Sequence, residues 1–172
     1  LVTTTLSGQE VRVVSDNSID WGSQRGWYLD LPVTGERMAT DMVLRGGRLI
    51  FVTVIPSSSA CEAGGDSLLM ELNAATGGRL DVIAFDIDGD GTFDLDDMAE
   101  ITVDGVTTKV PVSGRKFDSI VQRPSIIRVG TDSASTTGGK EFKYLSSSDG
   151  SIKQVTESDP VRRGRKSWLQ FQ

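Results

Sequence analysis

The fold is decided by the stretch Met42-Val43-Leu44-Arg45-Gly46-Gly47-Arg48-Leu49-Ile50-Phe51-Val52-Thr53-Val54-Ile55. β-Branched and aromatic residues dominate the longer of its two apolar runs, and such residues favour strands. The Gly-Gly pair between the runs supplies the positive φ angles that a tight hairpin turn requires. The stretch therefore predicts two antiparallel strands, Met42 to Leu44 and Arg48 to Ile55.

The same alternation of strand-like runs and turn-forming residues continues along the chain. Almost every apolar segment is short and bounded by Gly, Asp, Asn, Ser or Pro. Asp104-Gly105 and Asp149-Gly150 also separate strand-like runs. Signals for helices are nearly missing. We therefore predict an all-β fold of antiparallel sheets, with further strands at Glu10 to Val14, Trp27 to Leu31, Leu68 to Leu72, Val82 to Phe85, Glu100 to Val103, Thr107 to Val112, Ser125 to Val129, Phe142 to Leu145 and Ile152 to Val155.

The domain organisation follows from length and from a weak repeat. A chain of 172 residues forms a single β domain or the terminal part of a larger one. A strand running into a polar turn with Gly recurs at Tyr28 to Gly35, Met70 to Gly77 and Tyr144 to Gly150, and the first interval matches the length of a propeller blade. Polar composition predicts flexible surface loops over 56–66 and 131–140.

Composition excludes several classes of function. The formal net charge is −6 and no basic run interleaves with aromatic residues, so nucleic acid is not an expected partner. No apolar run is long enough to span a bilayer. The chain starts at Leu1 without a signal-like segment, which we interpret as processing or as a fragment. There is no His, and the single cysteine, Cys61, is expected to be buried, unless it pairs with a cysteine of another chain.

A dense acidic segment, Asp86-Ile87-Asp88-Gly89-Asp90-Gly91-Thr92-Phe93-Asp94-Leu95-Asp96-Asp97, has the spacing of a calcium loop. Gly91 occupies the sixth position, where the chain turns sharply around the ion. So many carboxylates close together repel one another unless a cation is bound. We therefore predict a Ca²⁺ site whose ligands are Asp86, Asp88, Asp90, the backbone carbonyl of Thr92, Asp94 and Asp97. The alternative is a solvated acidic turn.

The loop departs from the helix-loop-helix type of calcium site in two ways. Asp97 stands where that type carries Glu, and Asp96 competes with it to close the site. Leu80 to Phe85 favours an entering strand and not a helix. We expect Phe93 to anchor the loop inward. Extracellular calcium modules bind with dissociation constants on the order of 10⁻⁴ to 10⁻³ M, so the site suits a secreted protein.

Several segments together carry a resemblance to a known family: Gly26 to Arg37, Leu44 to Phe51 with Ile55 to Ser58, Leu72 to Leu80, and Gly164 to Trp168. They resemble the C-terminal region of the PilY/PilC family of type IV pilus proteins. The resemblance implies a secreted protein at the pilus tip or outer cell surface that acts in pilus biogenesis, twitching motility and adhesion. It also implies the C-terminal blades of a modified β-propeller with calcium binding, and partners among minor pilins and host receptors or glycans.

Three other features have functional and structural interpretations. Trp21, Trp27 and Trp168 form either packing contacts, which we favour, or a sugar-stacking platform. The candidate partner-binding residues form a basic group near the end of the chain: Arg162, Arg163, Arg165 and Lys166. The alternative is that this group is a solvated charged tail. The many serines lack a His or a nucleophile elbow, so no enzyme activity is predicted.

Two alternative functions remain open from the sequence. The first is an independent calcium-dependent carbohydrate-binding β module, in which Ca²⁺ orders loops that present Trp or Asp to a glycan. The second is a fragment of a quinoprotein propeller enzyme. The strands that lead into Thr-Gly turns in this chain resemble the blades of such enzymes, but the tryptophans that recur in those blades are not evident in this sequence.

Overall fold

A computed structural model of the chain describes residues 1–57, 64–129 and 139–160. Antiparallel strands form three sheets, of seven, three and two strands, so the predicted all-β class is confirmed. The only helical turn among these residues is the short 3₁₀ helix η1 (Leu95–Asp97). In the same residues, no helix has the length and apolar character needed to cross a membrane.

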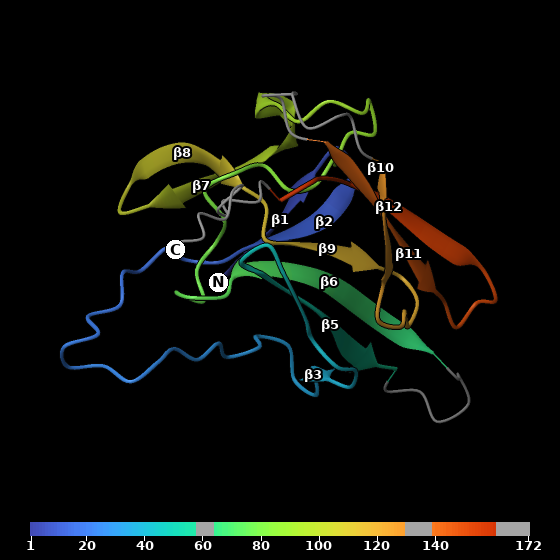
Figure 1. The fold of residues 1–172 in the computed structure, drawn as a ribbon, viewed down its shortest axis with the longest axis horizontal. Helices are drawn as coiled ribbons and strands as arrows, with labels where there is room; N and C mark the ends of the chain where they lie inside the picture. Colours follow the sequence, from blue (N-terminus) through green and yellow to red (C-terminus); the bar gives the residue numbers. More distant parts are fainter. Residues whose placement is uncertain (58–63, 130–138, 161–172) are drawn as a thin grey trace, which may run out of the picture.

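The seven-stranded sheet forms the base of the molecule (Figure 1). Its central hairpin consists of two nine-residue strands that pair from Arg48↔Asn73 to Pro56↔Gly65. In spatial order the strands are β1 (Val2–Leu6), β2 (Gln9–Val13), β9 (Gly114–Phe117), β6 (Gly65–Asn73), β5 (Arg48–Pro56) and β3 (Arg37–Met38), and β4 (Val43–Arg45) also pairs with β5.

The two smaller sheets lie over one face of the large sheet. Strands of the three-stranded sheet follow one another along the chain: β10 (Ser125–Val129), β11 (Lys140–Ser146) and β12 (Ile152–Ser158). The two-stranded sheet is the hairpin of β7 (Met98–Val103) and β8 (Val106–Pro111). Three predicted hairpin turns are thereby confirmed, at Gly46-Gly47, Asp104-Gly105 and Asp149-Gly150.

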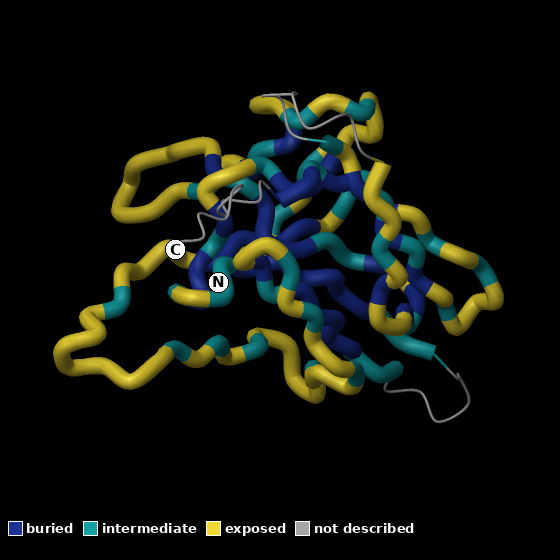
Figure 2. The backbone as a smooth tube through the Cα atoms, viewed as in Figure 1, coloured by how far each residue is buried: buried dark blue, intermediate teal, exposed yellow. Residues whose placement is uncertain are grey.

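Apolar side chains pack on both faces of the large sheet. The main core lies between this sheet and the smaller ones, and it includes Ile50 and Leu69 from the large sheet with Leu145 and Val155 from β11 and β12. A smaller core on the opposite face contains Phe51, Leu68, Met70 and Leu72. Burying both faces explains why apolar residues occupy successive positions in β5, at Leu49 to Val52, and in β6, at Leu68 to Met70, and Figure 2 shows both strands inside the buried interior.

The smaller core is covered by an irregular segment, residues 14–36, which we call the arm. The arm extends to the lower left of Figure 1 and is mostly exposed in Figure 2. Its end is fixed by a buried pair of hydrogen bonds from Arg12 to Glu36, with a further one from Thr53 to Glu36. The predicted strand Trp27 to Leu31 lies here and is wrong, because this backbone has no neighbouring strand. Its apolar side chains pack across the sheet instead.

Other strand predictions need correction. Val82 to Phe85 is not a strand: only Phe85 forms an isolated bridge, to Glu157 of β12. Three strands, β1, β3 and β9, were not predicted. β3 has two residues and β9 is polar, so tertiary pairing decides both, whereas β1 consists mostly of β-branched residues that favour a strand and was missed.

The predicted blade repeat and the predicted loops have mixed outcomes. The first copy of the repeat, Tyr28 to Gly35, contains no strand, and four-stranded blades stay a prediction. Both predicted loops fall largely outside the described residues. Of their described residues, Pro56, Gly65, Asp66 and Lys140 belong to strands, whereas Ser57, Gly64 and Gly139 are in no strand.

Candidate calcium-binding loop

The acidic loop, residues 86–97, is attached to the body of the protein at both ends. At its start the N–H of Asp86 donates to the carbonyl of Thr156 in β12, at 3.2 Å. At its end η1 leads directly into β7. Ile87 is buried in the main core, whereas Phe93, the predicted anchor, is only half-buried. A sheet and a core residue therefore hold the loop in place.

Three carboxylates of the loop converge. One oxygen from each of Asp86, Asp88 and Asp97 lies within 4.8 Å of the other two. Asp86 and Asp97 are buried, with exposed fractions of 5% and 1%, whereas Asp88 faces solvent. Carboxylate oxygens are the ligands that Ca²⁺ and Mg²⁺ take in proteins. The chemistry and the convergence of these three side chains therefore fit a hard divalent cation that enters from the solvent side.

Backbone N–H groups orient the buried carboxylates. Asp86 accepts hydrogen bonds from Gly89 at 2.8 Å and from Gly91 at 3.1 Å, one on each oxygen. Gly91 has a φ of 81°, in the left-handed region that favours glycine, which agrees with the sharp turn predicted there. Asp97 accepts from Ile87 at 2.5 Å and Asp88 at 3.4 Å on Oδ1, and from Asp94 at 3.4 Å on Oδ2. Because each carboxylate oxygen has two lone pairs, both oxygens of Asp86 and Oδ2 of Asp97 keep acceptor capacity for a cation.

The remaining predicted ligands form a second, exposed group. The hydroxyl of Thr92 donates to Asp90 at 2.8 Å and is 3.0 Å from an oxygen of Asp94. Asp94 also caps η1 by accepting from the N–H of Asp96 at 2.9 Å. The structure therefore brings Asp86, Asp88 and Asp97 into one cluster and leaves Asp90 and Asp94 beside it.

The two candidates for closing the site differ in position. Asp97 is buried and belongs to the three-carboxylate cluster. The side chain of Asp96 is exposed and lies 4.0 Å from the ammonium group of Lys109. The geometry therefore favours Asp97 as the residue that closes the loop, with Asp96 as a surface charge.

Electrostatics disfavour a full negative charge on the cluster. Burial, the largest cause, raises the pKa of Asp97 above its ordinary value, the neighbouring Asp88 raises it further, and backbone hydrogen bonds oppose both. At the exposed edge, hydrogen bonds from Thr92 and the nearby charge of Lys140 lower the pKa of Asp90. Within the described part of the chain, no Lys or Arg pairs with Asp86, Asp88 or Asp97 within 4.0 Å. Beyond that distance the charge of Asp86 still acts on Arg115, whose pKa it raises against the larger lowering by burial, and a bound cation would balance the remaining negative charge.

Comparisons with known proteins bear on the identity of this chain. No protein-family model matches it. A "Type IV pilus biogenesis factor PilY1 homolog" from Xylella fastidiosa is 34% identical over 145 residues, which cover 78% of this chain. The crystal structure of the Pseudomonas aeruginosa PilY1 C-terminal domain superposes with a TM-score of 0.61 over 91% of this chain. The chain is a relative of the C-terminal region of PilY1.

The relation to PilY1 has clear limits of extent. The PilY1 protein of Pseudomonas aeruginosa strain PAO1 is 32% identical over 98 residues, or 51% of this chain. The chain spans 11% of the Xylella relative and 8% of this Pseudomonas protein. It covers 29% of the crystallised PilY1 domain at 23% identity, so that likeness shows the fold alone. The resemblance stated from the sequence is confirmed.

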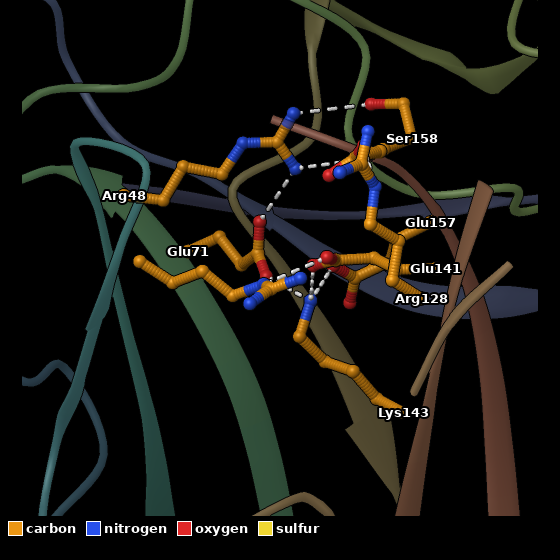
Figure 3. A network of polar contacts seen from close by, with 9 residues as sticks. Arg48, Glu71, Arg128, Glu141, Lys143, Glu157 and Ser158 are labelled. Carbon is orange, nitrogen blue, oxygen red and sulfur yellow. Dashed lines mark hydrogen bonds and ion pairs between the residues drawn. The ribbon is translucent and has the colours of Figure 1, made fainter. Parts of the chain in front are cut away.

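A second group of carboxylates, unlike the loop, was not predicted (Figure 3). The buried ion cluster lies between the large sheet and the three-stranded sheet, and the ammonium of Lys143 contacts three glutamates in it. Its distances are 2.5 Å to Glu71 and 3.3 Å to Glu141, and Glu157 is also in contact. Arg48 and Arg45 pair with Glu71 and Glu141. The available signal was strand parity, since Glu141 and Lys143 share a face with the apolar Leu145.

The other candidate residues lie elsewhere or outside the described residues. Trp21 is 57% exposed, so its predicted packing role is wrong, because it lies on the arm away from both cores. Trp27 is half-buried and packs against the smaller core as predicted. Outside the described residues are Cys61, Arg162, Arg163, Arg165, Lys166 and Trp168.

Proposed function

We propose that this chain is a calcium-binding, non-catalytic module of a type IV pilus biogenesis protein. The observation that carries the proposal is the 34% identity, over 78% of the chain, with a protein named as a PilY1 homolog. The convergence of Asp86, Asp88 and Asp97 in the acidic loop supports the calcium part. Because the chain spans only a small share of its relatives, its role is that of one part of such a protein.

Calcium would act on the loop as a structural ion. Asp86, Asp88 and Asp97 would hold it at the base of the loop, and Asp90, Asp94 and the carbonyl of Thr92 would complete the site from the exposed side. The ion would neutralise the carboxylates and fix residues 86–97 against β12 and β7. An affinity on the order of 10⁻⁴ to 10⁻³ M would leave the site filled outside the cell and largely empty inside it.

The proposed location is the pilus tip or the outer cell surface. The proposed partners are minor pilins and, for adhesion, host receptors or glycans, in line with the pilus role named for the relatives. The module would act by presenting a calcium-dependent surface and not by catalysis. The lack of His removes the commonest general base and supports a non-catalytic role.

We also propose that the chain contributes the C-terminal blades of a larger, modified β-propeller. The fold likeness to part of a crystallised domain more than three times as long supports this placement, because it leaves room for further strands. The described sheets have seven, three and two strands, so such blades would be modified and not regular four-stranded units.

A chimera tests the pilus role. In a Pseudomonas aeruginosa strain lacking PilY1, the matching C-terminal segment of PilY1 is replaced by this chain, and surface pili and twitching zones are measured. The proposal predicts restored pili and twitching, with loss of twitching when the chimera carries Asp97→Asn and no loss with Asp96→Asn. A chimera that is secreted and folded yet restores neither pili nor twitching would contradict it.

A further inference from the structure

A cleft of about 400 Å³ lies between the arm and the turn that follows β6. This volume falls within the range of small-molecule binding sites, roughly 300 to 1,000 Å³. The arm, which lines much of the cleft, extends to the lower left of Figure 1, whereas the acidic loop lies at the top. Its lining combines aromatic and uncharged polar side chains with one carboxylate: Asn17, Ser18, Trp27, Tyr28, Asp30 and Thr76.

The indole of Trp27 forms a preformed aromatic wall. Its Nε1–H donates to the carbonyl of Ala74 at 3.2 Å, which fixes the orientation of the ring. The ring packs directly on Gly77, where a Cβ atom would lie 2.2 Å from Cδ2 of the indole. Gly77 also has a φ of 68°, so both the backbone and the ring require glycine there. A fixed ring loses little conformational freedom when a ligand binds.

Other side chains at the cleft remain available to a ligand. Tyr28 is 85% exposed although it is a large aromatic residue. Among the described residues, the side chains of Asn17, Ser18 and Asp30 make no hydrogen bond or ion pair with the protein. The cleft therefore presents an aromatic surface next to free amide, hydroxyl and carboxylate groups.

The chemistry of the lining selects a class of ligand. Among the described residues, no Lys or Arg lines the cleft, which argues against phosphate and other anionic groups. Sugars present an apolar C–H face and several hydroxyl groups, which match an aromatic ring beside amide and carboxylate side chains. We propose that this cleft binds a neutral saccharide, independently of calcium at the acidic loop.

Titration of the whole chain with methyl glycosides of galactose, glucose, mannose and N-acetylglucosamine tests the proposal. Two-dimensional ¹⁵N–¹H NMR with the isotope-labelled protein reports which residues respond. We expect at least one glycoside to bind in the millimolar range and to shift the signals of residues 15–30 and 76–78. Excess chelator should leave these shifts unchanged, which separates this site from the acidic loop.

Variants make the assignment specific. Tyr28→Ala and Asn17→Ala alter exposed side chains and should each weaken binding by about tenfold, the scale of one lost aromatic or polar contact. Trp21→Ala is the matched control, because Trp21 is exposed on the same arm but does not line the cleft. The proposal is overturned if no glycoside shifts these signals, if binding survives Tyr28→Ala unchanged, or if chelation abolishes it.

Discussion

Two groups of three carboxylates in the described residues, the buried ion cluster and the base of the acidic loop, differ in what balances their charge. In the buried ion cluster Glu71, Glu141 and Glu157 surround Lys143, and two arginines complete the pairing. In the acidic loop Asp86, Asp88 and Asp97 converge without a Lys or Arg within 4.0 Å in the described part of the chain. The interior is neutralised by the protein's own cations, whereas the loop is suited to one from outside.

The two groups are connected through β12. Glu157 contributes its side chain to the buried ion cluster, and its backbone bridges Phe85, the residue before the acidic loop. The neighbouring Thr156 accepts a hydrogen bond from Asp86. The strand that carries part of the internal pairing therefore also supports the first residue of the loop.

The largest effect is expected from removing the internal cation. Lys143→Met would leave three glutamates buried without their shared ammonium, and breaking a buried ion pair in this way costs about 3–5 kcal/mol. Urea denaturation followed by circular dichroism measures the loss in free energy of unfolding. Added calcium should not restore it.

A matched double variant checks the cause of that loss. Lys143→Met with Glu157→Gln removes one buried negative charge together with the cation, so it should be more stable than Lys143→Met alone. If Lys143→Met costs less than about 1 kcal/mol, the cluster does not have the importance for stability that its burial indicates.

The next largest effect concerns which aspartate closes the loop. Asp97→Asn removes a carboxylate of the cluster and should weaken calcium binding by tenfold to a hundredfold, about 1.4–2.7 kcal/mol. Asp96→Asn alters the adjacent but exposed side chain and should leave the affinity nearly unchanged. The shift in melting temperature as a function of calcium concentration compares the two variants. Equal losses in both would show that the three-carboxylate cluster is not the centre of the site.

Removing calcium from the wild-type protein should have a smaller effect. Binding to the folded state alone stabilises it by RT ln(1 + [Ca²⁺]/Kd), about 1.4 kcal/mol when calcium is tenfold above Kd. Denaturation with excess chelator and with calcium measures this difference. A chelator that leaves the free energy of unfolding unchanged would mean that the loop is a solvated acidic turn.

The smallest expected effect is on the pH dependence. The pKa of Asp97 is raised in the calcium-free folded state, so ionising it there costs stability as pH rises through that pKa. Calcium requires the ionised form and removes this cost. The calcium-induced rise in melting temperature should therefore shrink as pH falls from about 7 to about 4. A constant rise over this range in wild type, equal to that of Asp97→Asn, would contradict the assigned role of Asp97.

Local sequence patterns predicted the hairpins and the acidic loop because their causes are local. The Gly46-Gly47 turn and the long run that follows it fix β4 and β5, and aspartate spacing places the loop between Asp86 and Asp97. Long-range contacts decide the features that were missed. Trp27 to Leu31 has strand-like composition but no pairing partner, and it covers the smaller core instead.

The buried ion cluster is the second feature that local sequence patterns could not predict. Glu71, Glu141 and Glu157 come from three strands, and no local pattern shows that they meet around one lysine. Strand parity places Glu141 and Lys143 on the same face as Leu145, but it does not identify their partners. The three glutamates meet Lys143 only because β6 packs against β11 and β12, and this packing cannot be read from the local sequence.

The most direct test of the contrast is isothermal calorimetry of the chelator-stripped protein with Ca²⁺ and with Mg²⁺. The loop offers several carboxylates in an irregular arrangement, which suits the flexible coordination of Ca²⁺ better than the octahedral demand of Mg²⁺. We predict one Ca²⁺-selective site whose affinity falls by tenfold or more in Asp97→Asn and is nearly unchanged in Asp96→Asn. Absence of binding heat, together with an unchanged melting temperature in calcium, would contradict the claim that the loop takes its balancing charge from outside.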